Sequence, residues 1–110
     1  MVLRPGIVYL ICDPANDFYK IGVTTAKSAK RLKQLQTGNG TELHIVHEHH
    51  TNYPFLVEKM LHNKYSYLLE HGEWFRLPPA DVIGFEKICE VQEQNIEALR
   101  DSPFFAKYLK

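Results

Sequence analysis

Three residues near the N-terminus could together form a reactive patch, namely Tyr9, Lys20 and Gly22. They lie in two short runs of β-branched and aromatic residues, 7–12 and 18–23, which are separated by a turn-forming segment. This pattern predicts a β-hairpin with a loop longer than two residues. Because side chains alternate along a strand, we expect all three residues on one face. A phenol, an ammonium group and a bare glycine backbone on one face are more typical of a site than of a core.

Two further charged residues, Arg31 and Glu58, lie on predicted helices. The first helix covers residues 26–36, and a Thr-Gly-Asn-Gly segment ends it. A guanidinium group can clamp a phosphate through two hydrogen bonds, and a carboxylate is a preferred ligand of Mg²⁺. Solvated surface charges of both types are also common on helices, so this pattern alone leaves both interpretations open. The same is true of His62, one turn after Glu58, which could equally be a packed helix histidine.

The elements that must position these residues predict an α+β fold. A small, mainly antiparallel three-stranded sheet is expected from residues 6–23 and 41–51, with helices flanking it. The helix that carries Glu58 should begin at Pro54, with Asn52 as its cap.

The C-terminal part of the chain predicts further helix. A tight turn at residues 71–73 leads into a short strand, and residues 80–100 have the periodicity of an amphipathic helix. Its expected inward side chains are Val82, Phe85, Ile88, Val91, Ile96 and Leu99. We expect residues 1–77 to form the core and residues 78–110 to be a helical extension of the same domain.

Length and composition are those of an ordinary globular domain. The chain has 110 residues, 45% of them hydrophobic and 24% charged, which is enough for one small core. There is no apolar stretch of membrane-spanning length and no secretion signal pattern, so we expect neither membrane insertion nor secretion. The two cysteines, Cys12 and Cys89, lie in apolar runs without a CxxC motif. Free thiols of this kind predict a reducing compartment, the cytoplasm or the nucleus.

Charge is distributed unevenly although the net charge is zero. Residues 1–40 contain six Lys and Arg against two acids, and the remaining seventy contain seven bases against eleven acids. A uniformly basic coat for nucleic acid is therefore absent, while a local basic face on the first half is allowed.

Four histidines in the predicted strand 41–51 raise the question of a zinc site. These are His44, His47, His49 and His50. Strand alternation divides them between two faces, and no cysteine or second histidine pair lies nearby in sequence to complete four ligands. We therefore expect solvent-facing histidines in this strand.

The hairpin residues carry a resemblance to a known family. Gly6-Ile7-Val8-Tyr9 and Tyr19-Lys20-Ile21-Gly22 are similar to the two motifs of the GIY-YIG nucleases, in the branch that resembles the phage T5 Orf172 and Mug113 proteins. Counted back from Gly22, the tyrosine position of the second motif holds Lys20. The run 30–39, the segment around Glu58 and the segment 71–77 also resemble that branch.

The resemblance implies a metal-dependent endonuclease that hydrolyses DNA phosphodiester bonds. It implies one divalent ion, Mg²⁺ or Mn²⁺, held by Glu58. The catalytic residues that it implies are Tyr9, Arg31, Glu58 and His62, and we expect Lys20 to act with them because of its place beside Tyr9. We expect nucleic-acid contacts at Gly22, Lys27, Lys30 and Lys33. Arg31 would clamp the phosphate, and Tyr9 would act as general base toward water. A free phenol has a pKa of about 10, so we expect Lys20 to lower the pKa of Tyr9.

Two other functions remain open at this point. The chain could be a non-cleaving DNA-binding module that keeps the fold, as Lys20 in the tyrosine position would suggest. It could also be an interaction protein that uses its acidic C-terminal helix, and a homodimer formed through that helix is a candidate assembly.

Overall fold

The predicted hairpin lies at the centre of the sheet. In a computed structural model, which describes residues 5–25, 28–37 and 42–100, β1 (Gly6–Asp13) and β2 (Phe18–Thr24) pair antiparallel. The turn between them is longer than two residues, as predicted, and Asp17 has a positive φ of 57° there. The register places Tyr9 opposite Gly22 and Ile11 opposite Lys20. Tyr9, Lys20 and Gly22 therefore share one face of the hairpin, and that prediction is confirmed.

The α+β fold is confirmed, and the sheet extends beyond the three expected strands. Among the described residues it has five antiparallel strands in the order β3-β1-β2-β5-β4. β3 (His44–Thr51) pairs with β1, while β5 (Trp74–Phe75) pairs with β2 and with β4 (Leu69–His71). β5 is the short strand predicted to follow the tight turn at residues 71–73, whereas β4 was not expected. Gly72, with φ +55°, makes the turn between them.

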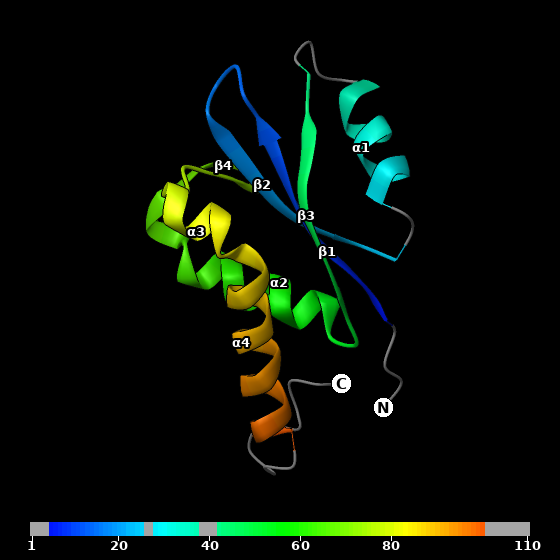
Figure 1. Cartoon of the computed structure of the whole chain (residues 1–110), viewed down its shortest axis with the longest axis vertical. Helices are drawn as coiled ribbons and strands as arrows, with labels where there is room; N and C mark the ends of the chain where they lie inside the picture. The colour runs from blue at the N-terminus through cyan, green and yellow to red at the C-terminus, as the bar shows by residue number, and fades with distance from the viewer. Residues whose placement is uncertain (1–4, 26–27, 38–41, 101–110) are drawn as a thin grey trace.

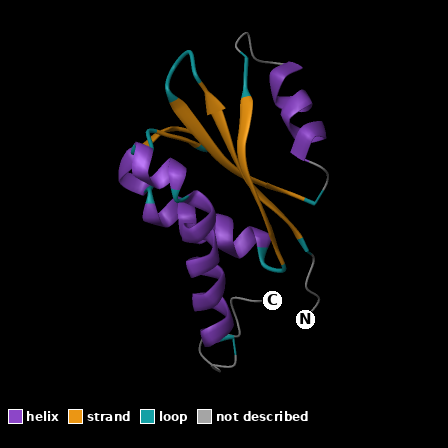
Figure 2. Ribbon diagram, viewed as in Figure 1, coloured by secondary structure: helices purple, strands orange, loops and turns teal. Residues whose placement is uncertain are grey.

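Helices cover both faces of the sheet (Figures 1 and 2). α1 (Ser28–Thr37) lies on one face, and α2 (Pro54–Lys64), α3 (Pro79–Ile83) and α4 (Phe85–Leu99) lie on the other. A 3₁₀ turn, η1 (Ser66–Leu68), follows α2.

Strand alternation separates the two layers of the core. Val8 and Leu10 of β1 pack among apolar side chains of α2 and α4. Tyr9 and Ile11 point the other way, into a smaller cluster that includes Leu32 of α1. β1 is buried on both faces, which explains why its sequence is a nearly continuous apolar run.

Two local predictions about the helices are wrong. Asn52 was expected to cap α2, but the N-cap residue is Tyr53, which makes no capping hydrogen bond with its side chain. Asn52 is exposed, and the Tyr53 amide donates to Thr51 Oγ1 at 3.1 Å. The single helix expected over 80–100 is divided at Gly84 into α3 and α4.

The expected inward face of the C-terminal helix is only partly buried. Phe85 and Ile96 are fully buried, but Val91 and Leu99 are exposed, which corrects their prediction as inward. In the described part of the chain, no helix has both the length and the apolar character needed to cross a bilayer.

The strand histidines are also less exposed than predicted. His49 is buried, with Nε2 3.3 Å from Glu93 Oε2 of α4, and His47 Nε2 donates to the Val82 carbonyl at 3.0 Å. The helices α3 and α4 cover these rings, which the strand pattern alone could not reveal. His44 and His50 are exposed, as predicted.

Candidate active site

The side chain of Tyr9 extends from β1 over Gly22 of the neighbouring strand β2. A Cβ atom built on Gly22 would lie 2.3 Å from both the hydroxyl oxygen and Cζ of Tyr9, a separation that real structures do not allow. Because Gly22 has no side chain, the phenol ring of Tyr9 can lie against the backbone of β2 at this position. The ring of Tyr9 fills the space beside the Cα of Gly22. Contact between Gly22 and DNA stays a prediction.

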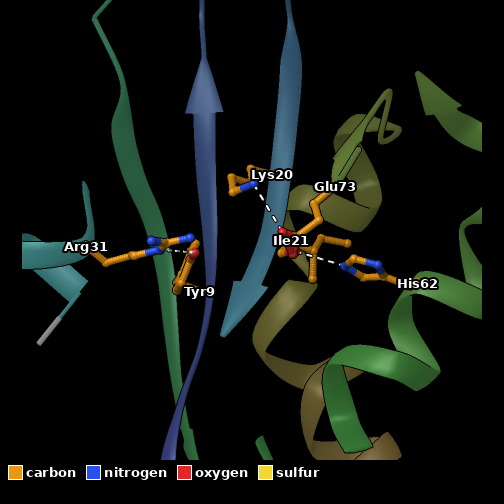
Figure 3. Close-up of polar contacts among 6 residues, drawn as sticks. All are labelled: Tyr9, Lys20, Ile21, Arg31, His62 and Glu73. Carbon is orange, nitrogen blue, oxygen red and sulfur yellow. Dashed lines mark hydrogen bonds and ion pairs between the residues drawn. The ribbon is translucent and has the colours of Figure 1, made fainter. Parts of the chain in front are cut away.

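Arg31 reaches the Tyr9 hydroxyl from α1 (Figure 3). Its Nε–H donates to the hydroxyl oxygen at 3.2 Å. Leu32, the next residue of α1, packs against the cluster that contains Tyr9, so the helix is anchored where Arg31 faces the sheet. The phenol and the guanidinium thus form one unit although they are 22 positions apart in the sequence.

A second group of side chains gathers beside the part of β2 that does not pair with β5. One ligating atom each from Glu58, His62 and Glu73 lies within 4.8 Å of the others. Glu58 and His62 are one turn apart on α2 and therefore face the same way. Glu73 comes from the turn between β4 and β5.

The backbone of Ile21 holds this second group in place. β5 pairs with β2 only at Tyr19 and Lys20, so the next backbone groups along β2 are available to other partners. The Ile21 amide donates to the Glu73 carbonyl at 3.2 Å, and the Ile21 carbonyl accepts from His62 Nε2 at 2.9 Å. A histidine that donates from Nε2 keeps its lone pair on Nδ1.

Lys20 lies on the sheet side of the same group (Figure 3). Its side chain is only 9% exposed, and Nζ is 3.3 Å from Glu73 Oε2. The ammonium also lies 5.5 Å from the centre of the Trp74 ring, its cross-strand neighbour. Lys20 is therefore paired with Glu73, and the cation that contacts the Tyr9 hydroxyl is Arg31.

The ionisation of Tyr9 differs from what we predicted. Burial raises the pKa of Tyr9 above its usual value, and the nearby charges of Glu73 and Glu58 raise it further. The hydrogen bond and the positive charge of Arg31 oppose this rise but do not overcome it. The prediction that Lys20 lowers the Tyr9 pKa is therefore wrong, because Lys20 is directed to Glu73. Tyr9 lies over Gly22 and His62 binds the carbonyl of Ile21, so the two groups of side chains contact neighbouring residues of β2.

The pKa of Glu58 is raised by its surroundings, which include a second acidic residue, Glu73. Burial raises the pKa of Glu58, and the charge of Glu73 and a hydrogen bond to it add to the rise. His62 and Lys20 act in the opposite direction. Two carboxyl groups this close favour holding a proton between them unless a cation takes its place.

The donor set fits a divalent metal ion. It offers two carboxylates and one imidazole from three different segments, and the imidazole is oriented by a backbone carbonyl, as is usual for metal-binding histidines. The raised pKa of Glu58 is a further sign of a half-buried pair of carboxylates that favours additional positive charge. Glu58, His62 and Glu73 are thus able to hold a metal ion.

The structure brings most of the predicted site residues together, and it adds one. Tyr9 and Arg31 meet, Glu58 and His62 meet, and Lys20 joins them through Glu73, a residue that we did not predict as part of the site. An acidic residue in a tight turn directly before Trp74 was the available signal. It could not be interpreted without knowing that β5 lies beside β2.

The structure describes two of the three lysines that were predicted to contact DNA. Lys30 and Lys33 are exposed on α1, and Lys27 lies outside the described residues. In the parts of the chain that the structure describes, the strand histidines form no group of three metal-ligating side chains.

Comparison with known proteins gives a family. No curated protein and no solved structure matched the chain. The family model of the T5orf172 domain, which is GIY-YIG-like, matches residues 6–90 and so includes both hairpin motifs, α2 and the first part of α4. The chain therefore belongs to the T5orf172 domain family.

Proposed function

We propose that the protein is a metal-dependent endonuclease that hydrolyses DNA phosphodiester bonds at this single site. The observation that carries the proposal is that a tyrosine–arginine pair lies over Gly22, while the Glu58–His62–Glu73 group is joined to the adjacent Ile21 of β2. Phosphodiester cleavage needs an activated water, stabilisation of charge at phosphorus and help for the leaving oxygen. The two groups divide these tasks.

Arg31 and Tyr9 serve the phosphate and the water. Nε of Arg31 is engaged with Tyr9, so the guanidinium has N–H groups left to donate to a non-bridging phosphate oxygen. Tyr9 is the proposed general base. Its phenol is neutral in the resting site, and the carboxylates of Glu58 and Glu73 contribute to that. Glu58, His62 and Glu73 would hold a divalent ion, whose positive charge would favour the phenolate form of Tyr9 that a general base requires and would stabilise the leaving oxygen.

One Mg²⁺ or Mn²⁺ is the proposed cofactor. Carboxylates suit both ions, whereas an imidazole is a more common partner of transition metals than of Mg²⁺. Because His62 belongs to the group, we expect Mn²⁺ to bind more tightly than Mg²⁺.

Nicking of supercoiled plasmid tests the proposal. With Mn²⁺ or Mg²⁺ present, the wild-type protein should convert supercoiled plasmid to open circles, and chelation should stop the reaction. Glu58→Gln keeps the shape of the side chain but removes the charge, so it should abolish nicking and leave DNA binding largely intact. Glu86→Gln, at an exposed residue in the first turn of α4, is the matched control and should cut like the wild type. Equal cutting by Glu58→Gln would rule out its role.

The alternative is a DNA-binding module that does not cleave. Two observations favour it: the raised pKa of Tyr9 and the ion pair by which Lys20 engages Glu73. Salt-sensitive retention of DNA, without cutting at any divalent metal concentration, would select this alternative. In either case the proposed DNA contacts are Lys30 and Lys33 on α1, together with Lys27, which lies outside the described residues.

We propose a division of the chain into a nuclease core, residues 1–77, and a helical extension, residues 78–110, of the same domain. Phe85, Cys89 and Ile96 of α4 support this, because they pack in the same cluster as Val8 and Leu10. Both cysteines are free thiols, which supports a reducing compartment, the cytoplasm or the nucleus. Pairing of two copies through α4 is testable by sedimentation.

A further inference from the structure

The position of Lys20 has a consequence for the metal group. Lys20 is opposite Trp74 in the β2–β5 pairing, and Glu73 directly precedes Trp74. The cross-strand register therefore brings the ammonium to the Glu73 carboxylate, at 3.3 Å. With its side chain only 9% exposed, Lys20 cannot move far into solvent to avoid a second cation beside Glu73.

The charges of the group show what this contact does. Glu58 and Glu73 together offer two negative charges to an ion, and Lys20 supplies one positive charge within the same cluster. Partly buried charges are screened much less by salt than exposed ones. A divalent ion must therefore bind next to an ammonium that already neutralises one of its ligands.

We propose that Lys20 acts as an internal competitor of the metal ion, pairing with Glu73 and weakening the affinity of the Glu58–His62–Glu73 group for divalent cations. The inference rests on the proposed metal site. It assigns Lys20 a role in setting metal affinity, which differs from contact with a phosphate and from activation of Tyr9. Glu73 then has two functions, because its carboxylate pairs with Lys20 through Oε2 and would also serve as a ligand of the metal.

Calorimetric titration with MnCl₂ in the absence of DNA tests the inference. Lys20→Met retains an unbranched side chain along Trp74 but removes the charge, so it should tighten Mn²⁺ binding by about tenfold or more. Lys87→Met removes an exposed lysine of α4 and is the matched control; it should leave binding unchanged. If Lys20→Met does not fold, Lys20→Gln, which also removes the charge, should give the same direction of change.

A double variant tests the part played by Glu73. If Lys20 acts through its ion pair, the increase in Mn²⁺ affinity caused by Lys20→Met should be smaller in a Glu73→Gln background. We expect this fold-increase to be about one third, or less, of the fold-increase in the wild type. Equal tightening in both backgrounds would overturn the role of the ion pair.

The outcomes separate this inference from the metal site itself. Failure of Mn²⁺ to bind both the wild type and Lys20→Met would refute the metal site. The metal site would be supported if the wild type binds Mn²⁺ and Glu58→Gln does not. If Lys20→Met then binds Mn²⁺ as tightly as the wild type, or more weakly, the proposed competition by Lys20 would be overturned. Tighter binding by Lys20→Met would establish it.

Discussion

Replacement of Gly22 by alanine tests the geometry on which the site depends. The new Cβ would lie 2.3 Å from the Tyr9 hydroxyl oxygen and from Cζ, and 2.6 Å from Cε1, so the ring must move. Moving the ring also breaks the 3.2 Å hydrogen bond from Arg31. Overpacking of this kind costs about 1–3 kcal/mol. A glycine-to-alanine change in an unobstructed strand would instead stabilise the protein by roughly 0.5–1 kcal/mol.

We therefore expect Gly22→Ala to lower the free energy of unfolding by about 1–3 kcal/mol, measured by urea denaturation. Gly84→Ala is the control. Its Cβ would lie 3.2 Å from the Ala80 carbonyl, a contact that small shifts can relieve, so the change should be below about 1 kcal/mol.

A double-mutant cycle with Tyr9→Leu identifies the cause. Leucine lacks the ring that covers Gly22, so Gly22→Ala should cost much less in the Tyr9→Leu background than in the wild type. If Gly22→Ala leaves stability unchanged, or costs the same in both backgrounds, then Tyr9 is not seated on Gly22 as described.

Three further predictions concern single groups. Tyr65→Phe removes the 2.6 Å hydrogen bond to Asp81 Oδ2, and should lower the free energy of unfolding by about 1.5–3 kcal/mol, the range for bonds to charged groups, in urea denaturation. The pKa of Glu58 is raised in the folded state, so its protonation adds stability that is fully present below its unfolded pKa and is lost as the pH rises through the folded pKa. Glu58→Gln should therefore stabilise the metal-free protein at pH 7 and lose that advantage at acidic pH, as thermal unfolding across the pH range would show; a destabilised variant at pH 7 would contradict the assigned pKa shift. Burial raises the pKa of the Cys89 thiol to about 12, so its alkylation by iodoacetamide at pH 8 should proceed only at the rate of unfolding, and rapid labelling of the native protein would refute this.

Much of the fold was determined by the sequence alone. The alternation around Tyr9 and Gly22 gave the hairpin and its shared face, because strand parity is a local property of the backbone. The apolar spacing of α2 gave a helix with Glu58 and His62 on the same side, since residues four apart are neighbours on any helix. Tyr9, Arg31 and Glu58 could be named as candidates because they lie in or near recognisable segments of the family.

Other features of the site depended on the tertiary structure. β5 has only two residues, and only its pairing with β2 brings Glu73 to Glu58 and Lys20. The cation beside Tyr9 is Arg31, because α1 packs over that face of the sheet while the register directs Lys20 to Glu73. Burial, which raises the pKa of both Tyr9 and Glu58, results from all the layers together. Local sequence fixes which way a side chain points from its own element, but only the packing of elements decides which charge it meets there.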